Sequence, residues 1–298
     1  MNVFLTGATG FIGKLVMRRL LEDPRFVCIK YLTRGVIAAP FDGAHCFAIK
    51  GRLNDFERYS HALAEADIVF HLGAELDSKA EDIRDVNVES TRFIARAIES
   101  RGIPLVFLSS ATVGKRMWET TYSETKKEAE NAILESGCRH IIIRPTWVIG
   151  SDSPSYRNFL SYLKKFPVVP VVGDGLTQQS PLYIDDCVNF IMAASRQTGS
   201  HIYTISGPER VSYVNMIHHT LKVIGIKKKL LIRLPVWLCK LLAEFTPALS
   251  YDAMSDFLEE SPVPNNDLSA FVKCPTNFHE ATSIILDKLK NNLVGETR

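Results

Sequence analysis

A run of eight residues near the start of the chain, Thr6–Gly13, constrains the fold more than any other feature. It follows the apolar segment Val3–Leu5 and precedes a helical pattern over Lys14–Leu21, so it predicts a strand, a glycine turn and a helix. Glycines at positions 7, 10 and 13 allow a tight turn and close approach to a pyrophosphate, which the N–H groups of the helix start would meet. The segment therefore predicts a nucleotide phosphate site, with an ordinary tight turn as the alternative.

Apolar segments that fit strands alternate with amphipathic segments through the first half of the chain. The expected strands are Val3–Leu5, Cys28–Leu32, His45–Ile49, Ile68–Leu72, Leu105–Leu108 and Ile141–Ile143. The expected helices between them are Lys14–Leu21, Tyr59–Ala64, Val86–Ser100 and Ser123–Glu135. This alternation predicts an α/β fold, a doubly wound parallel sheet of the Rossmann type with helices on both faces.

The character of the chain changes after Gly150. Pro, Ser, Gly and aromatic residues dominate through Ser180, which predicts a loop-rich excursion, and the chain from Gly207 onward is mostly helical in pattern. We therefore expect a dinucleotide-binding domain of residues 1–150, to which residues 181–206 return. Residues 151–180 and 207–298 would form a smaller, mostly helical substrate-binding region.

The charge balance and the cysteines exclude several classes of protein. With 35 basic and 33 acidic residues the net charge is +2, so no overall field favours nucleic acid or an anionic membrane. The six cysteines are scattered and lack the spacing of a zinc site, which predicts buried thiols in a reducing compartment and no metal. No signal-peptide pattern precedes the first strand, so we expect a cytoplasmic protein.

One stretch, Lys227–Lys229 followed by Leu230–Phe245, combines a basic leader with apolar residues. Charges interrupt it, and it is too short to span a bilayer. As an amphipathic helix it could lie on a membrane or a partner, but such helices more often bury their apolar stripe within their own domain. We expect that internal role, with membrane contact as the less favoured alternative. The expected partner is a small-molecule substrate, and a homodimer is left open.

The second informative feature is a tyrosine and a lysine four residues apart, Tyr122 and Lys126, on an expected helix. One helical turn places both side chains on the same face. A free tyrosine titrates at about pH 10, so it exchanges protons poorly at neutrality unless a cation such as Lys126 favours its phenolate. Ser110, after the preceding strand, would hydrogen-bond a substrate oxygen while Tyr122 exchanges the proton. A lone Tyr-x-x-x-Lys pair also occurs by chance on surface helices.

In their order along the chain, these motifs resemble the extended or atypical short-chain dehydrogenases/reductases, the superfamily of NAD-dependent epimerases, dehydratases and reductases. The resemblance covers roughly residues 1–225, on the stretches Thr6–Gly13, His71–Ala74, Asn87–Thr91, Leu108–Val113, Tyr122–Lys126, Arg144–Gly150 and Tyr183–Asp186. Part of the pattern is similar to the sub-branch that includes the complex I accessory subunit. Many members of that sub-branch lack the tyrosine and lysine that this chain keeps.

The resemblance implies roles for individual residues. Ser110, Tyr122 and Lys126 would be the catalytic triad, and Lys126 would also hold the nicotinamide ribose. The remaining residues would bind the cofactor beside the glycine turn, beneath it, along the neighbouring helix or at the nicotinamide. They are Gly7, Thr9, Gly10, Phe11, Ile12, Arg34, Leu53, Leu72, Gly73, Ala74, Asn87, Pro145, Trp147 and Val148.

Arg34 stands at the end of the second expected strand, where an NAD-preferring member carries an acidic residue for the adenosine ribose. Arginine suits a 2′-phosphate, so we predict NADP(H), with NAD(H) as the second choice. The alternative is an exposed loop arginine. Arg52 replaces an acid of the family pattern and favours the same cofactor.

Three further features have structural interpretations that we prefer. His71 is expected to end a buried strand and not to act as a base or ligand. Asp185 and Asp186 look like a metal pair, but without a third ligand nearby they are expected to cap a helix and make a structural hydrogen bond. Gly173–Gly175 is expected to form a tight turn.

The sequence therefore predicts an NAD(P)-dependent oxidoreductase or epimerase that transfers a hydride between a nicotinamide and a secondary alcohol or ketone, with tyrosine acid/base catalysis. A sugar nucleotide substrate stays open, although Trp147–Ser151 departs from the epimerase pattern. The alternative function is a non-catalytic NADP(H)-binding assembly or sensing protein that docks a partner through its C-terminal helices.

Overall fold

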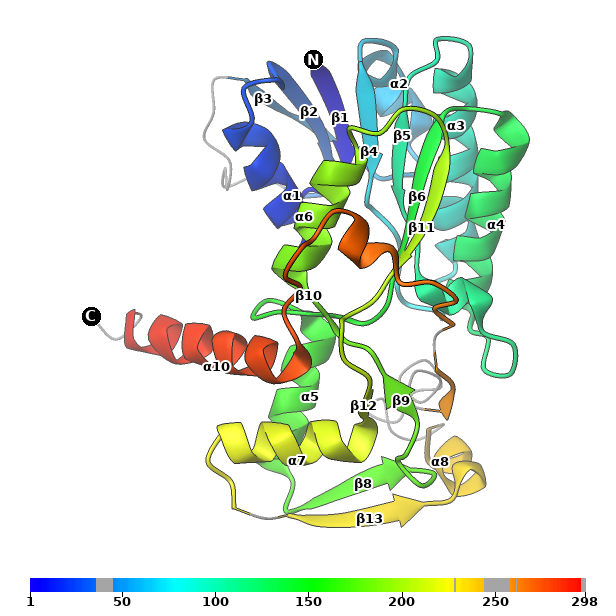
Figure 1. The fold of residues 1–298 in the computed structure, drawn as a ribbon. Coiled ribbons are helices and arrows are strands. Elements are labelled where there is room, and N and C mark those ends of the chain that lie inside the picture. Colours follow the sequence, from blue (N-terminus) through cyan, green and yellow to red (C-terminus); the bar gives the residue numbers. More distant parts are fainter. Residues whose placement is uncertain (36–44, 228, 244–257, 261, 296–298) are drawn as a thin grey trace. The chain divides into compact units, whose positions relative to one another are not determined.

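The structure is a computed structural model that describes residues 1–35, 45–227, 229–243, 258–260 and 262–295 (Figure 1). Contacts divide the chain into two units. Unit 1 consists of Met1–Val113, Thr121–Arg144 and Val188–Thr204. Unit 2 consists of Gly114–Thr120, Pro145–Cys187 and Ile205–Arg298. Each unit is therefore assembled from three separate segments of the chain.

Unit 1 is built around a seven-stranded sheet in the order β11-β6-β5-β4-β1-β2-β3. The strands are β1 (Asn2–Thr6), β2 (Cys28–Thr33), β3 (Cys46–Lys50), β4 (Ile68–His71), β5 (Leu105–Leu108), β6 (His140–Pro145) and β11 (His201–Ile205). Strands β1 to β6 pair in parallel. The central strands are apolar along most of their length because helices cover both of their faces. The expected doubly wound parallel sheet is confirmed.

Helices lie on both faces of this sheet (Figure 1). On one face, α2 (Phe56–Ala64), α3 (Ser90–Glu99) and α4 (Thr121–Ser136) share one apolar core with the strands. The other face carries α1 (Phe11–Glu22) and α6 (Ile184–Ala194). A short π-helical turn, η1 (Asp85–Glu89), leads into α3. All the helices expected in this part of the chain form.

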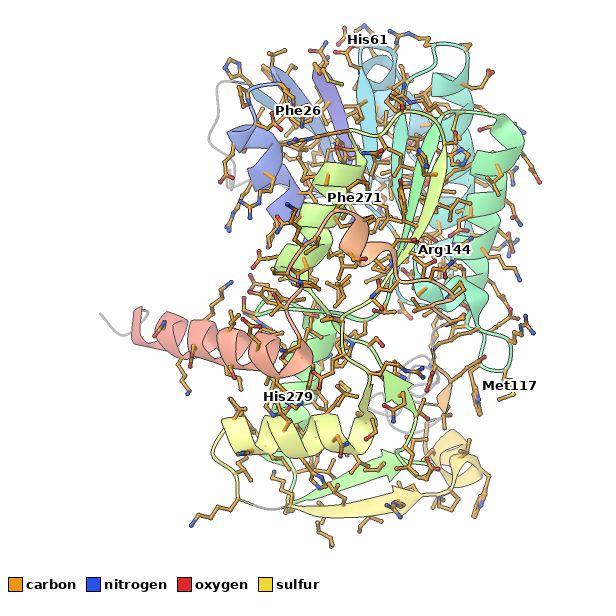
Figure 2. The ribbon with its side chains drawn as sticks, viewed as in Figure 1. Phe26, His61, Met117, Arg144, Phe271 and His279 are labelled. Atoms are coloured by element: carbon orange, nitrogen blue, oxygen red, sulfur yellow. The ribbon has the colours of Figure 1, made fainter. Side chains whose placement is uncertain are left out.

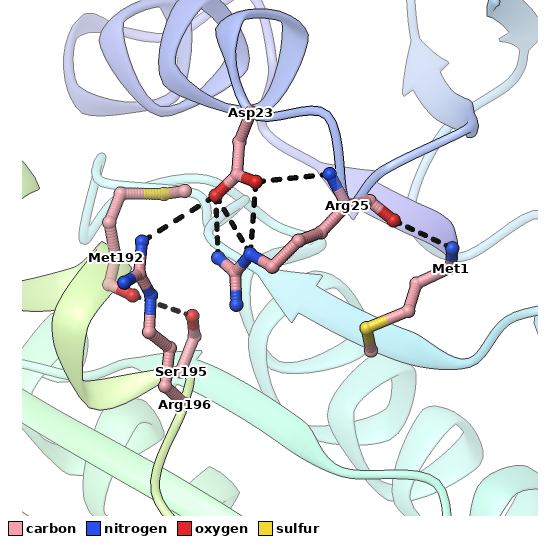
Figure 3. Close-up of polar contacts among 6 residues, drawn as sticks. All are labelled: Met1, Asp23, Arg25, Met192, Ser195 and Arg196. Carbon is pink, nitrogen blue, oxygen red and sulfur yellow. Dashed lines mark hydrogen bonds and ion pairs between the residues drawn. The ribbon is translucent and has the colours of Figure 1, made fainter.

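One acidic side chain joins the ends of α1 and α6 (Figure 3). Asp23 follows α1 and accepts hydrogen bonds from Arg25, at 2.9 Å from Nε and 2.6 Å from Nη2. The guanidinium of Arg196, just after α6, lies 3.6 Å from the same carboxylate. Hydrogen bonding to Arg25 lowers the pKa of Asp23 to about 2, so the carboxylate stays charged at neutral pH and holds both arginines.

In its described residues, unit 2 combines helices with three two-stranded sheets. The helices described there are α5 (Pro154–Lys165), α7 (Tyr213–Val223), α8 (Val236–Ala243) and α10 (Phe278–Gly295), with a 3₁₀ turn, η4 (Asp267–Ala270). The sheets pair β7 (Val148–Ile149) with β10 (Leu182–Tyr183), β9 (Gln178–Gln179) with β12 (Val211–Ser212), and β8 (Val168–Val172) with β13 (Leu230–Leu234).

Two local expectations for unit 2 were wrong. The segment expected to be loop-rich contains α5, which Ser153 caps by accepting a hydrogen bond from the Tyr156 N–H, and the valine-rich strand β8. The apolar residues after Lys229 do not form one helix, because Pro235 lacks the N–H that a continuous helix needs. Strand β13 precedes the proline and α8 follows it, and residues 244–257 lie outside the described ranges.

Candidate active site

Several of the expected site residues follow the carboxyl ends of neighbouring strands in unit 1. Gly7 comes directly after β1, Arg34 after β2, Gly73 just beyond β4, and Ser110 just beyond β5. Parallel strands end at the same edge of a sheet, so these positions line one edge. The strand order reverses between β1 and β4, and open α/β sheets bind their ligands at such a reversal.

The glycine turn after β1 has no room for side chains. Gly7 has a φ of +76°, and a Cβ added to it would lie 2.6 Å from the backbone nitrogen of Gly73. A Cβ on Gly13 would lie 1.9 Å from the carbonyl oxygen of Gly7. The first turn of α1 has no side-chain cap and no acidic residue. These features fit the phosphate groups of a dinucleotide, because the helix start presents uncapped N–H groups.

Thr9, Gly10, Phe11 and Ile12 form the rest of this turn and the start of α1, with Gly10 as the N-cap residue. The N–H of Gly10 donates to the carbonyl oxygen of Gly7 at 2.9 Å, which closes the turn. The backbone conformation thus defines the shape of the turn, and it fixes the positions of these four residues.

His71 links the glycine turn to a neighbouring helix through a buried chain of hydrogen bonds. The hydroxyl of Thr91 donates to the carbonyl oxygen of Asn87, so Thr91 accepts the proton of His71 Nε2 at 2.9 Å. His71 Nδ1 then accepts from Thr6 at 2.7 Å, and Thr6 accepts from the N–H of Gly73 at 3.1 Å. Burial lowers the pKa of His71 to about 3, which keeps it neutral. The histidine ends a buried strand, as the sequence predicts, and there it is a structural link.

Asn87, in the π-helical turn η1, joins the chain after β4 to α4. Its amide oxygen accepts the Glu75 N–H at 2.7 Å, and its amide nitrogen donates to the Glu75 carbonyl at 2.9 Å and to Thr125 at 3.1 Å. Thr125 lies between Tyr122 and Lys126 on α4. One side chain thus orients both the segment containing Leu72, Gly73 and Ala74 and the helix that carries the tyrosine and the lysine.

Lys126 is a buried cation at the end of β5. Its ammonium donates to the carbonyl oxygen of Leu108 at 2.6 Å and lies 4.0 Å from the ring centroid of Phe107. Burial lowers the pKa of Lys126 from 10.5 to about 7, and the Glu130 carboxylate opposes part of that shift. Leu108 is two residues before Ser110, so this hydrogen bond holds α4 against the strand end that carries the serine.

A loop separates Ser110 from Tyr122 in the sequence, and each of the two residues has its own hydrogen-bond partner. The hydroxyl oxygen of Ser110 accepts two hydrogen bonds from Thr112, from its N–H at 3.2 Å and its hydroxyl at 2.8 Å. Ser110 therefore keeps its own proton for another acceptor. Tyr122 is half-buried in the first turn of α4, and its N–H donates to Ser78 at 3.2 Å. The serine is thus prepared as a donor, on the same strand end that Lys126 contacts.

A second buried charge lies one turn further along α4. Glu130 accepts hydrogen bonds from the hydroxyl of Ser109 and from Arg144 on β6 (Figure 2), whose Nε lies 2.9 Å from Oε1. The Glu130 side chain is 3% exposed, and Arg144 is 30% exposed. The pair ties α4 to β5 and β6 beside the candidate catalytic residues.

Arg34 is exposed, and its guanidinium lies 3.8 Å from the Glu75 carboxylate. Arg52 pairs in the same loose way with Asp82, at 3.4 Å. The Leu53 side chain lies 3.1 Å from the position that a Cβ on Gly73 would take, so Leu53 borders the glycine turn.

Three of the expected cofactor residues, Pro145, Trp147 and Val148, belong to unit 2. There the Trp147 indole donates to Ser155 at 2.9 Å, and Val148 starts β7.

The loop before Tyr122 also belongs to unit 2, where one carboxylate holds it. Glu259 accepts hydrogen bonds from three successive backbone N–H groups, those of Arg116, Met117 and Trp118, at 2.9, 3.0 and 2.9 Å. These hydrogen bonds lower the pKa of Glu259. Sequence reasoning missed this contact, because more than 140 residues separate the partners.

Unit 2 also contains a polar pocket of about 320 Å³. Amide and hydroxyl side chains line much of it, namely Gln178, Gln179, Asn266, Thr146, Ser180 and Ser206. Among the described residues of its lining, the basic side chain is Arg210, which forms an ion pair with Glu260. The described lining therefore offers hydrogen bonds but little net positive charge.

Asp185 and Asp186 have structural partners. Asp186 accepts the Thr276 N–H at 2.7 Å, and Asp185 lies 3.7 Å from the ammonium of Lys288. Gly173–Gly175 forms a tight turn, with φ values of +64° at Gly173 and +71° at Gly175. The expected structural hydrogen bond is present at Asp186, but neither aspartate is the N-cap, because both lie within the first turn of α6. The expected tight turn at Gly173–Gly175 is present.

We expect Glu130→Gln to lower the free energy of unfolding by about 2–4 kcal/mol, because it leaves the half-buried Arg144 without its counter-charge. Glu128→Gln is the matched control on the same helix. Glu128 pairs with Arg84, whose side chain is 60% exposed, so its loss should cost less than about 1 kcal/mol. Urea unfolding measures both variants, and equal effects would contradict a special role for Glu130.

Lys126→Met is expected to stabilise the protein by about 2 kcal/mol at pH 7. The folded-state pKa of about 7 lies below the ordinary 10.5, so the folded protein binds fewer protons in that interval. Wild-type stability therefore rises with pH between these values, and the advantage of the variant should shrink. Urea unfolding at several pH values tests this, with the exposed Lys127→Met as control. A variant less stable than wild type at pH 7 would refute a costly buried ammonium.

Comparison with known proteins assigns the chain to a family. Residues 3–206 match the family model described as NAD dependent epimerase/dehydratase family. A curated relative is "NADH dehydrogenase [ubiquinone] 1 alpha subcomplex subunit 9, mitochondrial" from Arabidopsis thaliana, 24% identical over 68% of this chain and 53% of that protein. The chain thus spans about half the length of this relative.

The match to a second relative covers a larger share of that protein's length. It is the "4-hydroxy-2-methyl-3-oxo-4-farnesyl-3,4-dihydroquinoline-1-oxide ketoreductase" of Stigmatella aurantiaca, 24% identical over 76% of this chain and 74% of that enzyme. Among solved structures, the UDP-glucuronic acid 4-epimerase of Bacillus cereus in complex with NAD matches 98% of this chain and 99% of its own, with a TM-score of 0.75 and 19% identity. That structural likeness supports the fold. The family match shows that this chain belongs to the NAD dependent epimerase/dehydratase family.

Proposed function

We propose that the protein is an NADP(H)-dependent oxidoreductase that interconverts a ketone and a secondary alcohol, with Tyr122 as the acid/base. The observation that carries the proposal is the buried Lys126 ammonium, one helical turn from Tyr122 and anchored to the carbonyl oxygen of Leu108. An ammonium in a buried site is costly, and a fold keeps one where its charge has a task. Family membership supports an enzyme of this general type.

The proton step belongs to Tyr122. In the reducing direction its phenol gives a proton to the substrate oxygen, and in the oxidising direction its phenolate takes that proton back. A positive charge on Lys126 stabilises the phenolate, and the phenolate in turn favours a protonated Lys126. A bound nicotinamide would supply or accept the hydride.

Ser110 orients the substrate. Because its oxygen already accepts two hydrogen bonds from Thr112, its proton is directed to a further acceptor, which we assign to the substrate oxygen. Donation to that oxygen polarises a ketone and steadies the charge that develops during reduction. Thr112 is thereby a positioning residue for the serine.

For the substrate we favour a ketone or secondary alcohol without a diphosphate. The described lining of the unit 2 pocket includes one basic side chain, Arg210, and Glu260 neutralises it. A diphosphate needs cations or a helix start to offset its charge. The amide and hydroxyl groups of the pocket suit an uncharged polar group, and a ketoreductase is among the similar proteins. A sugar nucleotide is the second candidate, because several similar folds bind one.

For the cofactor we propose NADP(H) over NAD(H). Arg34 follows β2 and is exposed, with Glu75 as a loose partner, so its guanidinium is accessible to a 2′-phosphate. Several of the solved neighbours carry NAD, which makes NAD(H) the competing assignment.

Tyr122→Phe is expected to lower kcat by at least about 100-fold, because the variant cannot exchange the proton, while the affinity for NADPH stays unchanged. The assay follows NADPH absorbance with β-keto esters and β-keto amides of increasing chain length. Tyr162→Phe, on α5, serves as the matched control and should keep full turnover. Full activity of Tyr122→Phe would end the proposal.

Arg34→Ala is expected to weaken NADPH binding about tenfold and to leave NADH binding unchanged, because it removes one charge-assisted contact to the 2′-phosphate. Titration calorimetry measures both affinities. Arg19→Ala, which removes an exposed arginine paired with Glu22 on α1, controls for a general loss of positive charge. Equal NADPH affinity in Arg34→Ala and wild type would assign Arg34 to the surface alone.

A further inference from the structure

The two-stranded sheet of β8 and β13 leaves an apolar face exposed in unit 2. In its parallel register Leu230 pairs with Val168, and Ile232 pairs with Pro170. Paired residues point to the same face of a sheet, so these four apolar side chains lie together. Leu230 is 62% exposed and Ile232 is 42% exposed, and both partners are half-buried. The sequence predicts that the apolar residues after Lys229 are buried within their own domain. In β13, Leu230 and Ile232 are instead on the surface.

The opposite face of the same sheet is the one that packs within the unit. Val169 and Val171 alternate with the exposed positions and are fully buried. A Cβ on Gly175 would lie 2.5 Å from both Val171 and Val214, so the buried face packs towards α7. On the other face, the pair Val172 and Leu234 packs with Cys239 of α8, while Leu230 and Ile232 stay exposed. Among the described residues, the packing of unit 2 therefore explains only part of that face.

Two aromatic side chains belong to the segments that flank the sheet. Phe166 precedes β8 and is 42% exposed, and Trp237 follows β13 in α8 and is 68% exposed. The Lys165 ammonium lies 5.8 Å from the ring centroid of Phe166. Exposed aromatic rings beside lysines are typical of surfaces that enter the boundary between lipid headgroups and acyl chains. We name the six residues Phe166, Val168, Pro170, Leu230, Ile232 and Trp237 the apolar patch.

The chain around the apolar patch is strongly basic. Residues 222–243 contain six lysines and arginines and no acidic residue, although the whole chain has a net charge of only +2. Lys164, Lys165, Lys227 and Arg233 are exposed. Lys229 donates to the backbone carbonyl of Lys164 at 3.2 Å, which brings the end of α5 to the start of β13. Positive charge is therefore concentrated on the two segments that carry the apolar patch.

We propose that the apolar patch docks on the surface of an anionic lipid bilayer. The exposed apolar side chains would enter the headgroup boundary while the flanking lysines pair with lipid phosphates. Arg233 pairs with Val171 and so belongs to the opposite face. A second copy of the chain fits this face poorly, because it would bring two basic segments together. No helix in the described ranges is both long and apolar enough to cross a bilayer.

Co-sedimentation of the full chain with vesicles tests the proposal. The protein should bind vesicles of phosphatidylcholine mixed with phosphatidylglycerol at least about tenfold more tightly than vesicles of phosphatidylcholine alone. High salt should weaken the binding, because it screens the lysines. Neither measurement depends on the cofactor or on turnover, so the result is separate from the proposed function.

Variants assign the binding to the apolar patch. Trp237→Ala and the double change Lys164→Glu with Lys165→Glu should each weaken vesicle binding about tenfold or more. The matched controls are Phe47→Ala, at an aromatic side chain on β3 that is 52% exposed, and Arg101→Glu with Arg139→Glu, at exposed positions of unit 1. The controls should bind as wild type does. All variants should share the wild-type thermal transition, because the altered side chains are exposed.

Four results would overturn the proposal. The first is no binding to the anionic vesicles, and the second is equal binding to both vesicle types. The third is a dimer of the wild-type protein, seen by analytical ultracentrifugation, that Trp237→Ala converts to a monomer, which would assign the face to a second copy. Loss of binding in the control variants to the same extent would also contradict it.

Discussion

The arrangement of unit 1 around its candidate catalytic residues depends on the burial of one ammonium group. Lys126 reaches the carbonyl oxygen of Leu108 from α4, and this contact sets the distance between the helix and the end of β5. Burial makes the charge costly and lowers its pKa to about 7. Glu130, one turn along, holds the same helix to β5 and β6 through Ser109 and Arg144. Two hydrogen-bonded charges, on Lys126 and Glu130, therefore hold α4 against the sheet, and this fixes the position of Tyr122 in its first turn.

The glycine turn is connected to this same helix through polar side chains. Thr6 and His71 link the turn to Thr91 by hydrogen bonds. Asn87 accepts a hydrogen bond from Thr91 and donates one to Thr125, which lies between the tyrosine and the lysine. All of these side chains are buried, so each has to be hydrogen-bonded. The dinucleotide site and the catalytic helix are thus parts of one hydrogen-bonded framework, whose members are scattered over 120 residues of sequence.

The central sheet could be predicted from the sequence because its strands are short apolar runs separated by amphipathic helices. Gly7 and Gly13 could also be recognised, since only glycine fits where the backbone approaches itself within van der Waals contact. The roles of Glu130 and Glu259 could not, because each depends on a partner that chain folding brings near. The role of Thr112, two residues from Ser110, depends on the local backbone conformation after β5. Strand β13 was missed for a different reason. Its apolar residues also fit a helix, and the pairing with β8 decides between the two.

The central claim is that the chain carries out hydride chemistry with Tyr122 as its acid/base. The most direct test supplies the purified protein with NADPH deuterated at the nicotinamide C4 position, together with a β-keto amide, and analyses the product by mass spectrometry. The account predicts an alcohol with deuterium on the carbinol carbon. A protein that binds the cofactor but transfers no deuterium, to this substrate or to a series of ketones with longer chains, would contradict it.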